Sequence, residues 1–277
     1  MRAARKRRSN RNRFVAGGLI VALVVGLIAL LINHSTGGTK SASSTSTTVA
    51  QVPTAAAVTG GQSVTGATPC PKADGTSPRT SHFAQAPPLC IDPTKHYTAT
   101  FDTSQGTIVV ALDTTTTPNT TNNFVVLSLY HYYDGSSFDR IDQSLNIIQG
   151  GSPSTQTIAD PGPGYTIKDE PAAKFTTDSS GNLHGPFTYA PGDLVMARGG
   201  AANSASAQYF FVTGPNAASG LNSQGTYVVF GQVTTGLSIL QNIEKNMFEA
   251  CPSTDPSCLG GVPSQVVLVR SIKITEQ

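Results

Sequence analysis

The last two thirds of the chain consist of short apolar runs, and this pattern constrains the fold more than any other feature. The runs are rich in β-branched and aromatic residues and are separated by Gly, Pro and Asp, which predicts strands. The predicted strands are residues 97–101, 107–112, 138–141, 147–150, 193–197, 208–213, 227–229 and 266–274. Only two stretches are typical of helices, one opened by Pro118 and one at residues 237–248. Many short strands with two helices predict a mainly β domain, a closed barrel capped at its ends.

The N-terminus has the composition of a membrane anchor. Residues 1–13 contain seven basic side chains and no acid, and residues 14–32 follow without a charge or a proline. A helix of these 19 residues would be roughly 28 Å long, close to the ~30 Å thickness of the hydrocarbon layer. By the positive-inside rule, residues 1–13 stay in the cytoplasm and the rest lies outside. We therefore expect a single-pass protein of the cytoplasmic membrane that contacts the lipid bilayer through residues 14–32.

Two other interpretations of this terminus are weaker. A cleaved signal peptide has an apolar region of about 7–15 residues and a small-residue cleavage site, whereas Asn33 and His34 follow the longer run here. Nucleic-acid binding is another use of a basic run, but membrane orientation and anionic lipids already explain its place beside the apolar run. Without those seven charges the net charge of +2 becomes about −5 (2 − 7), so the remainder has no basic field for a polyanion. We expect no nucleic-acid partner.

Residues 33–69 have the composition of a flexible linker. They are rich in Ser, Thr, Gly, Ala and Val, with one charge at Lys40 and no aromatic residue. Such a segment cannot bury enough apolar surface to offset the entropy that is lost on ordering. We expect a disordered tether between the anchor and the folded domain.

Four cysteines, Cys70, Cys90, Cys251 and Cys258, lie on the exported side. They are typical of an oxidising compartment and of two disulfides, for which three pairings are possible. We favour Cys70–Cys90 and Cys251–Cys258, because each pair closes a short loop rich in Pro, Ser and Asp. A metal site is the competing interpretation, but spacings of 20 and 7 without paired histidines do not favour one. Residues 70–96 are then a disulfide-bearing extension that precedes a barrel domain at residues 97–277.

Several fragments of the predicted barrel match the motifs of one enzyme family. They are Phe138-Asp139-Arg140-Ile141, Gln149-Gly150-Gly151, Val195-Met196-Ala197, Gln208-Tyr209-Phe210-Phe211 and the stretch YVVFGQV at residues 227–233. From about Tyr97 to the C-terminus the chain resembles the cyclophilin family of peptidyl-prolyl cis-trans isomerases, and in particular membrane-anchored bacterial, actinobacterial-like members. The resemblance implies an eight-stranded antiparallel barrel with a helix over each opening. It also implies isomerisation of X-Pro bonds, here in exported polypeptides.

X-Pro isomerisation needs no nucleophile, so we expect no metal and no cofactor. The barrier of about 18–20 kcal/mol comes from amide resonance, which weakens when the imide leaves water and its nitrogen accepts a hydrogen bond. The site therefore needs an apolar slot for the proline ring and a fixed donor beside it. We expect Arg140 to be this catalytic donor, because a guanidinium stays charged among apolar neighbours. The alternative is a structural arginine paired with Asp139 or Asp142.

The other candidate residues would bind the substrate. Gln149 and Gln208 can hold its backbone, since an amide group both donates and accepts. Strand alternation places Gln208 and Phe210 on one face and Tyr209 and Phe211 on the other, so Phe210 would form the floor of the proline slot. The predicted substrate-binding residues are Phe138, Ile147, Gln149, Ala197, Arg198, Gln208, Phe210, Leu221 and Tyr227.

The chain departs from the family pattern at three points, of which the first two, Asn146 and Arg198, favour an alternative function. Asn146 stands where the family commonly has phenylalanine, Arg198 stands where it usually has asparagine, and the chain contains no tryptophan. A barrel that kept its groove but lost most of its catalysis would be a membrane-anchored proline-peptide-binding module. A wall-associated scaffold with an unused groove is a third option, which the presence of Arg140 and Phe210 disfavours. We expect a monomer, because no surplus amphipathic helix is visible.

Overall fold

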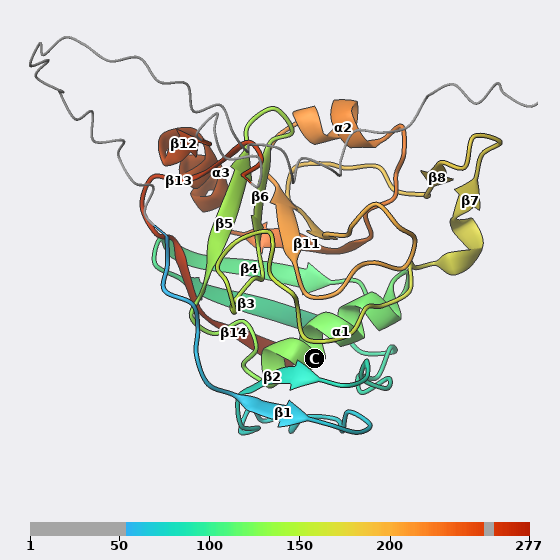
Figure 1. Cartoon of the computed structure of the whole chain (residues 1–277), viewed down its shortest axis with the longest axis vertical. Coiled ribbons are helices and arrows are strands. Elements are labelled where there is room, and N and C mark those ends of the chain that lie inside the picture. The colour runs from blue at the N-terminus through green and yellow to red at the C-terminus, as the bar shows by residue number, and fades with distance from the viewer. Residues whose placement is uncertain (1–53, 252–257) are drawn as a thin grey trace, which may run out of the picture. The chain divides into compact units, whose positions relative to one another are not determined.

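The structure is a computed structural model that describes residues 54–251 and 258–277. Eight antiparallel strands form a closed barrel (Figure 1). They are β3 (Tyr97–Thr103), β4 (Gly106–Leu112), β5 (Ser136–Asp142), β6 (Ile147–Gly150), β9 (Asp193–Met196), β10 (Tyr209–Val212), β11 (Val229–Thr235) and β14 (Leu268–Glu276). Their order is β5-β14-β3-β4-β11-β9-β10-β6, and the pairing of β6 with β5 closes the ring. The predicted eight-stranded antiparallel barrel is confirmed.

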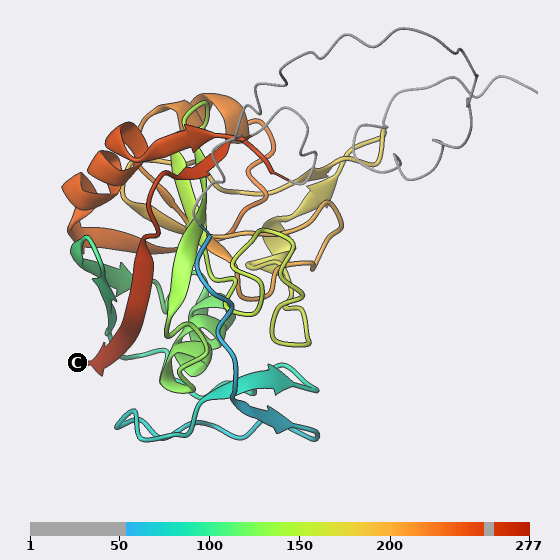
Figure 2. The same ribbon diagram turned by 60° about the vertical axis from the view of Figure 1, so that its left-hand side comes forward.

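The described residues contain three α-helices, one more than we expected for the barrel domain. α1 (Pro118–Leu129) and α3 (Leu237–Asn246) correspond to the two predicted helices and lie at opposite ends of the barrel (Figures 1 and 2). α2 (Asn216–Leu221) has six residues, one of which is a glycine, so its apolar spacing is too short to be recognised in the sequence. A single 3₁₀ turn is also described, at Ala172–Lys174. The strand expected at residues 227–229 begins only at Val229.

Aromatic rings fill the barrel at the end that α1 covers. Phe124 of α1 points into the barrel and meets the rings of Phe101, Tyr209 and Phe230, with centroid distances between 5.2 and 5.9 Å. All four side chains are fully buried. The rings meet in tilted or edge-on arrangements, which are the favoured geometries for aromatic pairs. One helix side chain thus joins strands from several sides of the barrel.

The N-terminal extension covers the outer face of α1. β1 (Gln62–Val64) and β2 (Thr80–Phe83) form a small parallel sheet there. Asn122 of α1 accepts a hydrogen bond from the backbone amide of Cys90, at 2.7 Å. Because α1 has the barrel on one side and the extension on the other, its residues 120–128 are all buried.

The extension begins earlier than the sequence predicts. Residues 54–69 belong to the predicted flexible linker, yet the amide of Val58 donates to the carbonyl of Pro153 and the carbonyl of Val64 accepts from Ala84, both at 2.8 Å. These bonds are made by the backbone to distant parts of the chain, so a low apolar content gives no sign of them. The remainder of the linker and the predicted anchor at residues 14–32 lie outside the described residues.

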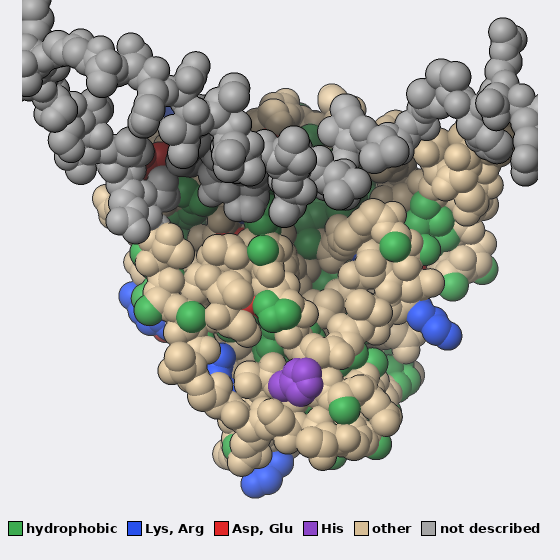
Figure 3. Space-filling model, viewed as in Figure 1, with side chains coloured by type: hydrophobic (Ala, Val, Ile, Leu, Met, Phe, Trp, Pro, Cys, Tyr) green, Lys and Arg blue, Asp and Glu red, His purple; other side chains and the backbone are tan. Residues whose placement is uncertain are grey.

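No helix within residues 54–251 and 258–277 is long and apolar enough to cross a membrane. On the face in Figure 3, the Lys and Arg side chains of the described residues are scattered and do not gather into a patch. This face therefore shows no basic patch among the described residues.

The two disulfides follow the favoured pairing. Cys70 bonds to Cys90, and Cys251 bonds to Cys258. The second disulfide links the two strands of a short hairpin at its loop end. The second of these strands pairs with β5. The remaining strands outside the barrel are this hairpin, β12 (Phe248–Ala250) and β13 (Gly261–Pro263), and a separate one, β7 (Thr176–Thr177) and β8 (Leu183–His184).

An acid from a distant segment caps the N-terminus of α1. The buried carboxylate of Glu170 accepts from the backbone amides of Asn119 and Thr120, at 3.1 and 2.9 Å, and from both of their side chains. The first amides of a helix have no partner within the helix, and the helix dipole favours a negative charge beside them. Thr117, at the N-cap position, makes no side-chain capping bond. Glu170 therefore does the capping and fixes the loop before it against α1.

We predict that Glu170→Ala lowers the free energy of unfolding by about 2–4 kcal/mol, because it leaves buried amides of α1 without a partner. Chemical denaturation of the purified protein with both disulfides intact measures this change. Lys168→Ala, which removes an exposed charge from the same segment, is the matched control and should change the free energy by less than about 0.5 kcal/mol. Equal effects of the two substitutions would contradict the capping role.

Candidate active site

A groove of about 490 Å³ lies outside the barrel and is lined by residues of β5, β6 and β10 and of the loops beside them. Nine of the ten residues predicted for the site line it, and Phe138 is the exception. The nine are Arg140, Ile147, Gln149, Ala197, Arg198, Gln208, Phe210, Leu221 and Tyr227.

Alternation along β10 separates the barrel core from the groove as predicted. Tyr209 and Phe211 are fully buried in the main core, whereas Gln208 and Phe210 line the groove. Side chains of successive strand residues point to opposite faces. This one strand therefore supplies both the aromatic interior and the floor of the groove.

Phe138 is the predicted site residue that the structure places elsewhere. Its ring lies inside the barrel, with its centroid 6.0 Å from that of Phe211. Strict alternation would put Phe138 and Arg140 on the same face. However, Phe138 pairs with Gly150 and Arg140 with Gln149, so the register shifts between them. This β-bulge turns Phe138 inward and Arg140 outward, and Phe138 is therefore a core residue and not part of the groove.

Arg140 is held by hydrogen bonds to three partners. Nη1 donates to Oε1 of Gln149 at 3.0 Å, Nη2 donates to Oδ2 of Asp142 at 2.6 Å, and Nε donates to the carbonyl of Leu259 at 3.1 Å. The ion pair with Asp142 is the structural alternative that the sequence offered, but it uses only one N–H group. A guanidinium has five N–H donors, so two (5 − 3) have no partner within the described residues. These two can face a peptide in the groove.

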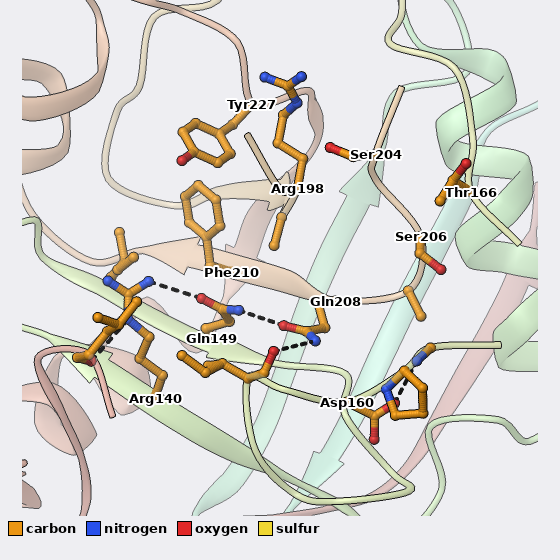
Figure 4. A pocket seen from close by; sticks show the side chains of 18 of the residues that line it. Arg140, Gln149, Asp160, Thr166, Arg198, Ser204, Ser206, Gln208, Phe210 and Tyr227 are labelled. Carbon is orange, nitrogen blue, oxygen red and sulfur yellow. Dashed lines mark hydrogen bonds between the residues drawn. The ribbon is translucent and has the colours of Figure 1, made fainter. Parts of the chain in front are cut away.

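The hydrogen bonds continue from Arg140 across the groove, as Figure 4 shows. Nε2 of Gln149 donates to Oε1 of Gln208 at 2.7 Å, and Nε2 of Gln208 donates to the carbonyl of Ile158 at 3.1 Å. Each amide thus uses one N–H group and keeps the other. This series of hydrogen bonds fixes the orientation of the Gln149 and Gln208 side chains, which can then hydrogen-bond the backbone of an extended peptide.

An apolar slot lies beside Arg140. Phe210, which is 3% exposed, forms its floor, and the ring of Tyr227 packs edge-on against it at 5.6 Å. Ile147 and Leu221 belong to the same cluster, which is distinct from the main core. The hydroxyl of Tyr189 accepts from the amide of Tyr227 and donates to its carbonyl, at 2.8 and 3.0 Å. The slot is therefore built by packing and by a fixed backbone position of Tyr227.

Arg198 lines the groove, but its charge is used within the protein. Its side chain is 5% exposed, with Nη2 3.5 Å from Oδ2 of Asp169. The same nitrogen donates to the carbonyl of Ala201 at 2.6 Å, and in Figure 4 the guanidinium points away from Gln149 and Gln208. Substrate binding by Arg198 stays a prediction; the contacts that the structure describes for it brace the loop that forms one wall of the groove.

Asn146 has a structural role outside the groove. It adopts a left-handed backbone conformation with φ of +51°, which asparagine tolerates better than most residues. Its Nδ2 donates to Oε1 of Glu244 at 2.7 Å, and its Oδ1 accepts from the amide of Asn216 at 3.0 Å. The position joins the start of β6 to α2 and α3, which a phenyl ring could not do with hydrogen bonds.

Several residues of the groove carry no signal in the sequence. Most belong to two loops, within residues 158–166 and 199–207, that meet over the groove. These loops make one half of the groove polar. The carboxylate of Asp160 there accepts from the amides of Thr155 and Gly162, at 2.8 and 2.9 Å. The unpredicted lining residues are Leu145, Ile158, Asp160, Pro161, Gly162, Tyr165, Thr166, Gly199, Ser204, Ser206, Ala207 and Leu259.

A buried acid, Asp139, lies next to Arg140 in sequence. It is 8% exposed, and neither carboxylate oxygen has a hydrogen-bond partner within the described residues. Burial disfavours the charged form and the charge of Asp160 repels it, so the pKa of Asp139 is raised to about 7. Ser152 and Arg140 only partly oppose this shift. The β-bulge that turns Arg140 outward thus leaves an acid inside the protein.

Comparison with known proteins gives consistent matches. A family model described as cyclophilin type peptidyl-prolyl cis-trans isomerase/CLD matches residues 98–273. Peptidyl-prolyl cis-trans isomerase B of Bacillus subtilis is 35% identical over 126 residues, which are 46% of this chain and 75% of that protein. A peptidyl-prolyl cis-trans isomerase of Helicobacter pylori is 32% identical over 151 residues, 53% of this chain and 80% of that protein. A crystal structure of a cyclophilin type isomerase from Cryptosporidium parvum has a TM-score of 0.46 at 25% identity and covers 66% of this chain and 99% of that one.

The raised pKa of Asp139 predicts how stability depends on pH. The carboxyl has a pKa of about 7 in the folded protein against 3.8 for an ordinary aspartate, so folding favours the protonated form. Relative to the ionised state, protonated Asp139 contributes up to about 4 kcal/mol to the free energy of unfolding. This contribution is complete below about pH 4 and is lost as the pH rises to about 7. Asp139→Asn, which cannot ionise, should therefore gain stability relative to wild type between about pH 5 and pH 8. Unfolding free energies at about pH 4.5, 6 and 8 measure the difference, and a constant difference across this range would contradict the shift.

Proposed function

This chain belongs to the cyclophilin-type peptidyl-prolyl cis-trans isomerase family, and on that basis we propose that it isomerises X-Pro bonds of exported proteins in the groove around Arg140. The family establishes the enzyme class. The roles of individual residues are proposals from geometry. The observation that supports them most directly is a guanidinium fixed at the edge of an apolar slot and linked through Gln149 to Gln208.

The proline ring would occupy the slot above Phe210. Ile147, Leu221 and Tyr227 surround this floor, so a bound imide would leave water for an apolar wall. Loss of water favours the less polar, twisted amide over the planar resonance form. The slot therefore lowers the barrier without any covalent step.

Arg140 would donate to the imide nitrogen as the bond twists. The nitrogen gains a lone pair when resonance is lost, and a charged N–H donor stabilises this state more than the planar one. Asp142, Gln149 and the carbonyl of Leu259 already hold the guanidinium, so little reorganisation is needed during the reaction. Such preorganised electrostatic stabilisation is often the largest contribution to catalysis.

The alternative function, a proline-peptide binder with weak catalysis, rested on Asn146 and Arg198. Both residues now have structural roles, in the loop before β6 and in the groove wall. Neither removes a donor or an apolar surface from the slot. The geometry therefore favours the isomerase over the weak binder.

We further propose that the enzyme acts outside the cytoplasmic membrane as an anchored monomer. The basic residues 1–13 before the apolar residues 14–32 support this orientation. The two disulfides, Cys70–Cys90 and Cys251–Cys258, are typical of an oxidising compartment. Its substrates would then be exported polypeptides whose X-Pro bonds relax in tens of seconds or more without a catalyst.

Arg140→Ala should lower kcat/KM for a short Ala-Pro peptide by about 10²–10³-fold, the usual cost of removing one preorganised donor. Protease-coupled or NMR exchange measurements of cis-to-trans relaxation give this value. Arg270→Ala removes an exposed arginine that pairs with Asp102 on the barrel surface, and it should retain wild-type activity. If folded wild-type protein binds the peptide but does not accelerate its relaxation, the peptide-binding module is the better account.

The proposed orientation can be tested with the full-length chain in bacterial cells. Protease added outside spheroplasts should digest the barrel domain and leave a tag before Met1 protected, because residues 1–13 remain in the cytoplasm. Deletion of residues 1–32 should keep the domain inside, with its four cysteines reduced. A full-length domain that resists external protease until the membrane is permeabilised would contradict the proposal.

A further inference from the structure

The third partner of Arg140 differs from the other two. Asp142 and Gln149 belong to the barrel strands β5 and β6, whereas the carbonyl of Leu259 comes from a segment 119 residues further along the chain. Leu259 directly follows Cys258, which is bonded to Cys251. Leu259, whose carbonyl is the partner of the proposed catalytic arginine, is thus joined by a peptide bond to a disulfide-bonded cysteine.

Leu259 is held through its chain neighbours, with the disulfide on one side and Gly260 and Gly261, which lie against β5, on the other. Its side chain is 52% exposed, so packing contributes little to its position. The β12–β13 hairpin has three residue pairs and is joined to the barrel by a single pair, Gly261 with Ile141. At its loop end the amide of Cys251 donates to the carbonyl of Gly260 at 3.2 Å. A hairpin this small is marginally stable by itself.

The backbone at Gly260 shows how closely this segment approaches the barrel. Gly260 has a φ of +78°, and a Cβ atom there would lie 2.7 Å from the carbonyl oxygen of Ile141. Only glycine allows both the left-handed conformation and this approach to β5. The segment can therefore bring the Leu259 carbonyl to Nε of Arg140.

We propose that the Cys251–Cys258 disulfide is a positioning element of the isomerase site, which holds the Leu259 carbonyl on Nε of Arg140. This proposal rests on the proposed catalytic role of Arg140. Opening the disulfide frees the hairpin end and removes one of three fixed partners of the guanidinium. Asp142 and Gln149 keep the side chain near the groove, so a peptide still binds. The donor is then less well placed for the twisted imide, and misplacement by about 1 Å can cost up to 10²-fold in rate.

The same bond makes the site responsive to thiol redox chemistry. A dithiol reductant opens the disulfide when its thiolate attacks one sulfur, forms a mixed disulfide and releases one cysteine thiol. Its second thiol then displaces the other cysteine. Two electrons and two protons pass to the protein, and the reductant becomes a cyclic disulfide. Activity is therefore highest in an oxidising compartment.

Cys70–Cys90 provides a matched control within the same chain. It lies against α1, where the amide of Cys90 donates to Asn122, and neither cysteine lines the groove. It closes a longer loop than Cys251–Cys258, with separations of 20 and 7 residues, so its loss should cost at least as much stability. An effect on activity through stability alone would appear in both disulfide variants.

The experiment compares the full-length chain, purified in mild detergent, with the Cys251→Ser/Cys258→Ser and Cys70→Ser/Cys90→Ser double variants. For the first variant we expect kcat/KM on an Ala-Pro peptide to fall about 5- to 30-fold, while the peptide Kd changes by less than about twofold. Solvent exchange of the Arg140 Hε proton, followed by NMR, should become at least about tenfold faster, because its carbonyl partner is lost. The Cys70→Ser/Cys90→Ser variant should keep all three values within about twofold.

Two further measurements distinguish positioning from general damage. Gly260→Ala displaces the segment with the disulfide intact and should reproduce the lower kcat/KM and the faster Hε exchange. In the Cys70→Ser/Cys90→Ser background, reduction by a dithiol should lower activity and reoxidation should restore it. Unchanged activity and Hε exchange in Cys251→Ser/Cys258→Ser, or equal losses in both disulfide variants, would overturn the proposal.

Failure of the underlying function would look different. Wild-type activity in Arg140→Ala would contradict the proposed catalytic role, and with it the catalytic part of this inference. The Hε exchange of Arg140 does not depend on turnover, so it would still show whether the disulfide holds the Leu259 carbonyl.

Discussion

The pairing of β5 with β6 is the constraint on which the rest of the structure depends. It closes the barrel. Its register shift between Phe138 and Arg140 places the Phe138 side chain in the core and the Arg140 side chain in the groove. A regular ladder would have sent both to the same face. The bulge also leaves Asp139 buried beside the site. One local irregularity thus turns Phe138 inward and Arg140 outward, and it buries an acid whose pKa is raised.

The proposed mechanism in the groove is stabilisation by a fixed charge in an apolar setting. Three hydrogen bonds hold the Arg140 guanidinium, and two glutamine amides extend the network over the strand surface. Phe210 supplies the apolar floor from the strand whose other face fills the barrel. Because the donors are fixed before substrate arrives, the proposed isomerisation needs little rearrangement of the protein.

The departures from the family pattern are explained by contacts that lie outside the slot. Asn146 ties the start of β6 to α2 and α3, and Arg198 pairs with Asp169 in the wall. Both residues therefore support elements around the slot without belonging to the slot itself. The disulfide-closed hairpin beside Leu259 is the proposed covalent support of Arg140, and it would link the site to the redox state of its surroundings.

The sequence by itself determined what depends on local order. Alternation placed Gln208 and Phe210 on one face, short apolar runs predicted the barrel strands, and short Cys–Cys separations predicted both disulfides, because these features need only neighbouring residues. Tertiary structure alone decided what depends on distant partners. The bulge at Phe138, the ordering of residues 54–69, the groove loops and the Leu259 contact 119 residues from Arg140 all depend on backbone groups that meet a partner from another segment. Backbone groups are the same in every residue, so their choice of partner leaves little trace in the sequence.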